Sequence, residues 1–252
     1  MVEERRRSAY FVPIAQPKKR GKQLEIETQW TRDRIKPNKE INRIRERVSI
    51  WRQGDYAGIT NTTRRLLEYW TDLGREKKLF FCQIEALETV IYIVEVAKKY
   101  GDAWIANMLR DANSTSNPGL DRIAFKMATG AGKTVVMAMF IVWHTLNKLE
   151  NRQDTRFSDT FLVITPGITI RDRLRVLLPN DPHNYYRERD IIPADMMDQL
   201  GRAKILITNF HAFKLRELIE SPKLNKKILT STFCFVYVTA SKNRRTIRYA
   251  GS

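Results

Sequence analysis

Residues 127–134 read Met127-Ala128-Thr129-Gly130-Ala131-Gly132-Lys133-Thr134, and this stretch decides how the rest of the chain is interpreted. The residues just before it, 122–126, are predicted to form an apolar strand. The apolar run 135–146 that follows is long enough for a buried helix. A glycine-rich turn between a strand and a helix lets backbone N–H groups point at a phosphate, so we predict a phosphate-binding loop here rather than a chance turn.

The residue types in this loop suit a nucleoside triphosphate. Gly130 and Gly132 can adopt positive φ angles and bring the backbone close to phosphate oxygens. Lys133 is expected to reach the β and γ phosphates, and the Thr134 hydroxyl to ligate Mg²⁺. The predicted ligands of ATP and Mg²⁺ in the loop, with the last two also expected to be catalytic, are Thr129, Gly130, Ala131, Gly132, Lys133 and Thr134.

Composition limits the classes of protein that the chain can belong to. With 252 residues, 42% of them hydrophobic, it can bury a core of one or two domains. The longest apolar run, 135–143, is too short for a membrane span, and the charged N-terminus lacks a signal peptide, so we expect a cytoplasmic protein without membrane contact. The two cysteines, Cys82 and Cys234, lack metal-ligand spacing and are expected to be reduced.

The formal net charge of +17 favours a polyanionic partner, most simply nucleic acid, over a merely soluble basic surface. Residues 1–65 hold about twice as many Lys and Arg as Asp and Glu. We expect irregular or extended structure up to about residue 37 and then an amphipathic helix with a basic outer face. A second helix is expected to follow, capped by residues 60–62.

Gln83 lies upstream of the loop and follows the aromatic pair Phe80 and Phe81, with Cys82 in between. An amide can donate to and accept from the adenine edge at the same time, while Phe80 or Phe81 covers the ring. The alternative is a Gln that caps a helix start. Beside a phosphate loop we prefer the adenine contact, with Phe81 and Gln83 as nucleotide-binding residues.

Two further strands are predicted at 161–165 and 204–208, each followed by a turn and a helix. Such alternation predicts a parallel α/β sheet, in which ligands bind at the carboxyl ends of the strands. Backbone N–H groups and hydroxyls there can hold nucleic-acid phosphates, although ordinary turns would look the same. The candidate nucleic-acid contacts are Thr165, Pro166, Gly167, Thr169, Arg171, Asn209 and His211.

These motifs, taken together, resemble superfamily 2 helicases of the DEAD/DEAH-box type. The set comprises Phe81-x-Gln83, the loop 127–134, Val163-Ile164-Thr165-Pro166-Gly167 and Ile207-Thr208-Asn209-Phe210-His211. The greatest similarity is to the restriction-enzyme branch, represented by the helicase subunit of type III systems. Met127 stands where the strict Walker A pattern has Gly, which is also typical of this branch.

The resemblance implies a RecA-like P-loop sheet with flanking helices and an activity of ATP hydrolysis coupled to movement along duplex DNA. It also implies an Asp-Glu-x-His motif at a strand end, and no Asp in this chain is followed by Glu. The apolar run 233–238 has the character of the strand that should carry it. We therefore expect an incomplete motor domain, cut short or altered after about Leu229, that hydrolyses little ATP on its own.

The expected organisation is a basic N-terminal region (1–78), an incomplete first motor domain (79–230) and a truncated or non-native tail (231–252). The expected function is the ATP-binding part of a DNA-dependent helicase or translocase of restriction-modification type. Further partners implied are a modification or specificity subunit, or missing C-terminal motor and nuclease domains. The alternative is a non-catalytic nucleic-acid-binding module with a vestigial nucleotide site; a P-loop phosphotransferase is disfavoured by Met127 and Gln83.

Overall fold

A computed structural model of the chain describes residues 7–11, 35–116, 122–209, 212 and 234–237. The chain divides into two compact units, residues 1–57 and residues 58–252. Each is considered by itself. The predicted division at residues 78 and 230 is a separate one and stays a prediction. Within the described residues, no helix is both long enough and apolar enough to cross a membrane.

The first unit contains a short strand pair and one helix. Strand β1 (Ala9–Phe11) pairs antiparallel with β2 (Ile35–Pro37), and helix α1 (Lys39–Gln53) follows. The first turn of α1 is tied to the chain before β1, because Asn42 accepts from the Ser8 N–H at 2.7 Å and donates to the Ser8 carbonyl at 2.9 Å. The buried side chains of α1, which recur at three- and four-residue spacing, are Ile44, Val48 and Trp51. The predicted amphipathic helix is confirmed.

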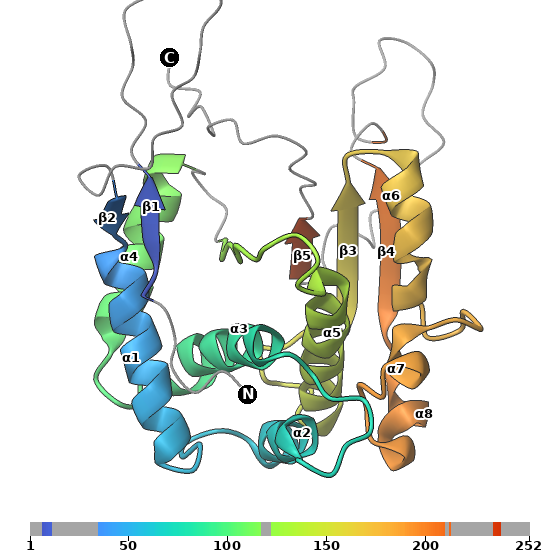
Figure 1. Ribbon diagram of the computed structural model, residues 1–252. Coiled ribbons are helices and arrows are strands. Elements are labelled where there is room, and N and C mark those ends of the chain that lie inside the picture. Colours follow the sequence, from blue (N-terminus) through green and yellow to red (C-terminus); the bar gives the residue numbers. More distant parts are fainter. Residues whose placement is uncertain (1–6, 12–34, 117–121, 210–211, 213–233, 238–252) are drawn as a thin grey trace, which may run out of the picture. The chain divides into compact units, whose positions relative to one another are not determined.

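The second unit holds the remaining elements, in which α2 to α5 precede the first strand and further short helices separate β3 from β4 (Figure 1). Its α-helices are α2 (Asn61–Thr71), α3 (Phe81–Ile91), α4 (Ala103–Ser116), α5 (Lys133–Glu150), α6 (Ile168–Arg173), α7 (Tyr185–Glu188) and α8 (Met197–Leu200). A π-helix, η2 (Tyr92–Val96), continues α3, and two 3₁₀ turns are η3 (Leu174–Leu177) and η4 (Ala194–Met196). Its strands are β3 (Thr160–Thr165), β4 (Lys204–Asn209) and β5 (Cys234–Tyr237).

The three strands that the structure describes in the second unit form a parallel sheet in the order β4-β3-β5. In β3 every second residue is buried, with Phe161, Val163 and Thr165 on the covered face. Both strands predicted from the apolar runs 161–165 and 204–208 are therefore confirmed, and so is their parallel pairing. The backbone of β3 is paired on both edges, and His144 of α5 lies against Phe161 on the covered face.

The strand predicted at 122–126 is wrong as a description of this structure. Residues 122–128 have no regular secondary structure and do not pair with any of the described strands. Ile123 and Phe125 are each 40% exposed. A strand is stabilised by the partner and the packing that it gains, and a short apolar run without them keeps its side chains in water. The phosphate-loop candidate thus follows an exposed, irregular segment rather than a buried strand.

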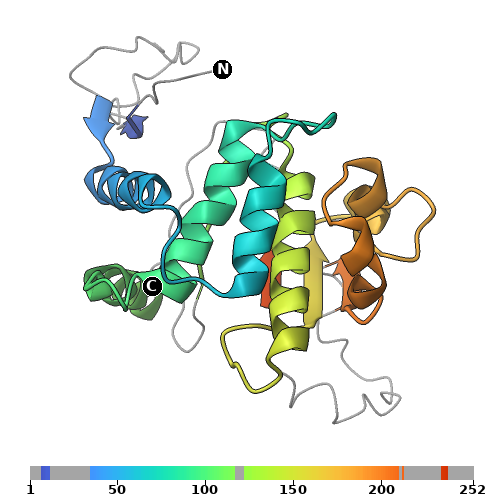
Figure 2. The ribbon, with the colours of Figure 1, turned by 90° about the horizontal axis from the view of Figure 1, so that it is seen from below.

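Helix α5 is the central element of the second unit, as the apolar run 135–146 predicts. Its buried positions extend from Val135 to Asn147 around nearly the whole helix, which is typical of a helix packed on several sides. It packs against α2, α3 and α8 (Figure 2). His144 contacts the sheet side, with its ring centroid 5.7 Å from Phe157 and 6.3 Å from Phe161.

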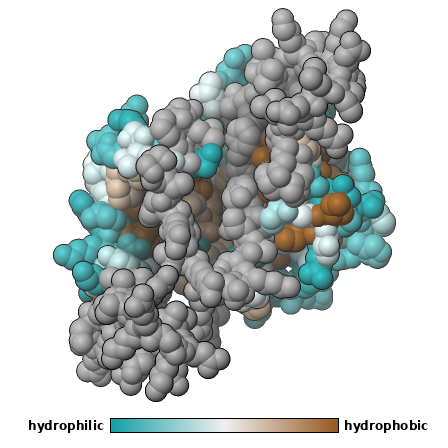
Figure 3. Space-filling model, turned by 90° about the horizontal axis from the view of Figure 1, so that it is seen from above, coloured by the Kyte–Doolittle hydropathy of each residue, from teal (hydrophilic) through white to brown (hydrophobic). Residues whose placement is uncertain are grey.

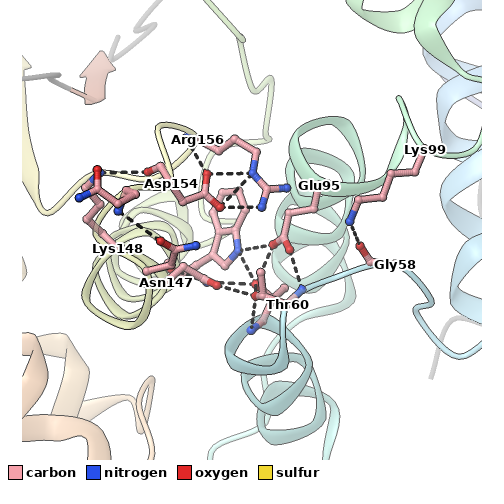
Figure 4. A network of polar contacts seen from close by, with 12 residues as sticks. Gly58, Thr60, Glu95, Lys99, Asn147, Lys148, Asp154 and Arg156 are labelled. Carbon is pink, nitrogen blue, oxygen red and sulfur yellow. Dashed lines mark hydrogen bonds and ion pairs between the residues drawn. The ribbon is translucent and has the colours of Figure 1, made fainter.

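A buried polar network fixes the C-terminal half of α5 (Figure 4). The carboxyl group of Glu95, in the π-helix, accepts hydrogen bonds from Thr60 N (2.8 Å), Thr63 Oγ1 (2.7 Å) and Trp143 Nε1 (3.0 Å). Asn147 Nδ2 donates to Thr63 Oγ1 at 3.0 Å. Thr60 also caps α2 by accepting from Thr63 N, which confirms the predicted cap. The network therefore joins α2, η2 and α5 through groups that are satisfied inside the protein.

Candidate functional site

The glycine-rich loop opens directly into α5. Gly130 and Gly132 have φ angles of +80° and +75°, and Gly132 is the N-cap residue of the helix. A Cβ atom on Gly130 would meet nothing within 4 Å, so the loop is open on that side. The first turn of an α-helix leaves backbone N–H groups without partners in the helix, and these groups carry partial positive charge. The loop therefore has the backbone conformation and the open space that an anion requires.

Lys133 and Thr134 lie on this first turn of α5, and both side chains are partly exposed. The Lys133 ammonium group donates to the Ala128 carbonyl at 2.7 Å, so it spans the loop from its end to its beginning. A phosphate in the loop would offer the same ammonium group a charged acceptor in place of a carbonyl. The predicted positions of both residues at the helix start agree with the observed geometry, while their ligands stay a prediction.

Gln83 lies in the first turn of α3 and touches the loop. Its Oε1 accepts from Phe80 N at 2.9 Å, and its Nε2 donates to the Ala131 carbonyl at 3.2 Å. The side chain is only 4% exposed. Each of these atoms keeps one further hydrogen-bonding site, because an amide has two N–H donors and two acceptor lone pairs, so it is the burial of Gln83 that opposes the predicted adenine contact.

The residues that precede Gln83 are more accessible. Phe80 is 61% exposed and Phe81 is 43% exposed. The exposed thiol of Cys82 approaches the Ala131 carbonyl, with Sγ 4.0 Å from the oxygen. At the start of α3, Phe80 and Phe81 are therefore open to solvent, and Cys82 lies beside the loop. Gln83 contacts the loop, whereas the nucleotide contacts of Phe81 and Gln83 stay predictions.

The carboxyl ends of β3 and β4 lie side by side, as expected for a parallel pair in which Thr165 is in register with Asn209. In Figure 1 the arrowheads of β3 and β4 and the N-terminal end of α5 all face upward, with the start of α5 lower than the arrowheads, and Figure 3 views the molecule from above. Thr165 is fully buried, and its hydroxyl donates to the Gly167 carbonyl at 3.0 Å. Asn209 Oδ1 accepts from Ala212 N at 3.2 Å. Both side chains shape their turns in this structure.

The other candidate nucleic-acid contacts are more exposed. Pro166 and Thr169 are exposed, and Gly167 is the N-cap residue of α6. Arg171 bonds its neighbour Asp172, with Nη2 2.8 Å from Oδ1, and its side chain is 43% exposed. His211 lies outside the described residues. Their proposed contacts with nucleic acid stay predictions.

A group of contacts around Arg75, which the sequence pattern did not predict, holds the segment that leads into α3; we call it the Arg75 clamp. The Arg75 guanidinium group donates to the carbonyls of Tyr69, Lys77 and Asp190, and it lies 3.4 Å from the Asp190 carboxylate. Burial and then the hydrogen bond to Asp190 raise the pKa of Tyr69 to about 12. A polar cavity of about 290 Å³ borders this clamp, lined by Glu76, Lys77, Arg187 and Asp190. No spacing rule connects residue 75 with residue 190, which only the folded chain brings together.

Among the described residues there is no group of three His, Cys, Asp or Glu side chains that could hold a metal ion. A hydroxyl such as that of Thr134 can still share a Mg²⁺ ion with phosphate oxygens and water, which are the ligands that Mg²⁺ commonly keeps. The predicted metal contact therefore depends on a bound nucleotide, and Thr134 is placed where the loop would bring one.

Comparison with known proteins identifies the family. The family model described as "Type III restriction enzyme, res subunit" matches residues 76–236, which include α3, the glycine-rich loop, α5 and the parallel sheet. No curated protein and no solved structure matches the chain. The predicted resemblance to the restriction branch is confirmed, and the chain belongs to the family of the res subunit of type III restriction enzymes.

Proposed function

We propose that this chain is the ATP-binding part of a DNA-dependent ATPase of helicase or translocase type, with a RecA-like arrangement around its sheet. The observation that carries the proposal is the glycine-rich loop, in which two glycines with positive φ lead directly into the buried helix α5 with Lys133 on its first turn. Family membership supports a helicase-like ATPase and the general use of ATP and Mg²⁺.

Each residue of the loop has a distinct part in this proposal. The backbone N–H groups at the start of α5 hold phosphate oxygens, and Gly130 and Gly132 keep side chains out of their way. Lys133 exchanges the Ala128 carbonyl for phosphate oxygens, and Thr134 places its hydroxyl toward Mg²⁺. Mg²⁺ supplies charge that offsets the phosphates. None of these contacts requires an Asp-Glu pair. Nucleotide binding is therefore a better test of the proposed site than ATP turnover.

Nucleic acid is the proposed partner of the same chain. The net charge of +17 supports a polyanion, and family membership supports nucleic acid and other subunits as partners in general. Duplex DNA, contacted at the carboxyl ends of β3 and β4, is the finer proposal. Pro166 and Thr169 are its exposed candidates within the described residues, and the Arg171 side chain is 43% exposed.

The proposal is tested by nucleotide binding and ATP turnover, with and without duplex DNA, at fixed low salt. Lys133→Ala should abolish nucleotide binding, because it removes the only loop side chain predicted to contact the β and γ phosphates. Lys98→Ala is the matched control, since Lys98 is an exposed lysine after α3 and far along the chain from the loop. It should leave binding unchanged.

The outcomes separate the two candidate functions. Nucleotide binding that Lys133→Ala removes and Lys98→Ala keeps supports the ATPase proposal, and DNA-stimulated turnover would extend it to a working motor. Salt-sensitive DNA binding without any nucleotide binding would instead favour a nucleic-acid-binding module with a vestigial nucleotide site, which the net charge alone also supports.

A further inference from the structure

The amide of Gln83 lies directly against the phosphate loop. Its Nε2 donates to the Ala131 carbonyl at 3.2 Å, and a Cβ atom built on Gly132 would lie 2.1 Å from that same nitrogen. The amide therefore occupies the volume that a side chain at position 132 would need. Glycine at this position serves the close approach of Gln83 as well as the positive φ angle.

The bond to Ala131 orients a potential phosphate donor. In a planar trans peptide, the carbonyl of one residue and the N–H of the next point in opposite directions. Holding the Ala131 carbonyl toward α3 therefore turns the Gly132 N–H away from α3. The position of Gln83 itself is fixed, because its Oε1 accepts from Phe80 N at 2.9 Å at the start of the helix.

The alternative partner of Gln83 would be the base of a nucleotide. The side chain is 4% exposed, with one amide atom bonded to α3 and the other to the loop. Each amide atom keeps one further hydrogen-bonding site, but the buried side chain would have to move away from α3 or the loop to reach a base. A hydrogen bond lost in that movement costs about 1 kcal/mol, which a contact with the base would have to offset.

We propose that Gln83 is a positioning residue for the triphosphate: it sets the direction of a backbone donor in the loop and thereby the affinity for phosphates irrespective of the base. This inference rests on the proposed nucleotide site and deepens it. Inorganic triphosphate has no base, so its binding affinity should depend on Gln83 as strongly as the affinity for ATP does.

The experiment measures the binding of ATP, GTP and inorganic triphosphate, each with Mg²⁺, to the full chain and to two variants. Gln83→Met is neutral and similar in length, but it can neither donate to Ala131 nor accept from Phe80 N. Gln83→Ala also removes both bonds. Thermal unfolding without ligand checks that each variant is folded, and Gln83→Met is the decisive variant because it removes the hydrogen bonds without adding a charge that would repel a triphosphate.

The expected result is that Gln83→Met weakens binding of all three ligands by a common factor of about ten, the size of one hydrogen bond. Weaker binding of ATP alone, with GTP and inorganic triphosphate unaffected, would overturn the inference in favour of base reading. Unchanged binding of all three would overturn it as well. If the unmodified chain binds none of the three ligands, the proposed nucleotide site itself fails, which is a distinct result.

Discussion

The two ends of α5 are built differently. At its C-terminal half, Trp143 and Asn147 belong to a buried network in which Glu95 accepts three hydrogen bonds, two from the start of α2 and one from α5 (Figure 4). At its N-terminus, the glycine-rich loop follows the exposed stretch 122–126 and is held to α3 by the amide of Gln83. The C-terminal half of α5 is fixed by buried polar groups, whereas its first turn keeps backbone N–H groups and Lys133 at the surface.

This difference shows how the helix can carry a site without relying on that site for its stability. The buried end places α5 against α2, α3 and the sheet, and the loop end offers backbone groups that a ligand can use. Stability and binding should therefore respond to different substitutions along the same helix. Each prediction below tests that separation, in order of decreasing effect.

The largest expected effect is that of Glu95→Ala, which we expect to lower the free energy of unfolding by about 3 kcal/mol, because buried donors would lose their acceptor. Urea-induced unfolding measures this loss. Glu95→Gln keeps one acceptor oxygen and should lose less. A loss below that of a typical surface substitution would mean that the network does not fix this end of the helix.

The second effect is a dependence of stability on pH that arises from His144. Burial lowers the pKa of this imidazole from 6.5 to about 3. Between these values the unfolded chain binds a proton that the folded chain excludes, so stability falls as pH falls below 6.5. The loss is about 1.4 kcal/mol per pH unit, or about 2 kcal/mol from pH 6.5 to pH 5.

The contribution of His144 is isolated by urea-induced unfolding of the unmodified chain and of His144→Gln at several pH values. The glutamine side chain of the variant does not take up a proton in this range. The difference between the two curves should grow as pH falls from 6.5. Parallel curves would show that His144 is not excluded from protonation in the folded chain, and that this part of α5 is more open than its burial indicates.

A comparison of Gly132→Ala with Gly130→Ala tests the loop end. Both residues have positive φ, which alanine adopts at a cost of about 1 kcal/mol, but only at Gly132 would the new Cβ meet the Gln83 amide. Gly132→Ala should therefore cost about 1 kcal/mol more than Gly130→Ala, by the size of the strain or of the lost hydrogen bond. Unfolding free energies of both variants measure the difference.

Combining Gly132→Ala with Gln83→Ala provides the control. Removing the amide should abolish the extra cost, because the volume beside position 132 is then empty. If the extra cost persists in the double variant, its origin is not the contact between Gln83 and the loop.

The sequence allowed prediction of those features that a local pattern determines. The apolar run 135–146 is helical, the runs 161–165 and 204–208 are parallel strands, and Gly130 and Gly132 have positive φ. The same patterns could not predict what depends on partners distant in sequence. Whether Gln83 bonds a loop carbonyl or a ligand depends on how α3 packs, and no periodicity encodes that choice.

The segment 122–126 illustrates the same limit for secondary structure. Its residues have the composition of a strand, but a strand also requires a neighbour that pairs with it. Among the described strands, β5 pairs with β3, and none pairs with 122–126. Local preference alone therefore gave a wrong prediction here, while the helix that follows needed only its own periodicity and packing.

The smallest expected effect is that of Phe125→Ala. Phe125 is 40% exposed in a stretch without regular structure, so its loss should change the free energy of unfolding by less than about 0.5 kcal/mol. Phe161→Ala is the matched control, because that ring is fully buried in β3, and its removal should cost several times more. Urea-induced unfolding of both variants measures the ratio.

An equal loss in the two phenylalanine variants would mean that residues 122–126 pack into the core in solution. The loop end of α5 would then be fixed as firmly as the end that carries Glu95, and the separation of stability from binding along this helix would fail. A negligible loss of stability for Phe125→Ala, together with weaker triphosphate binding in Gln83→Met, would show that α3, rather than the segment before the loop, controls the loop.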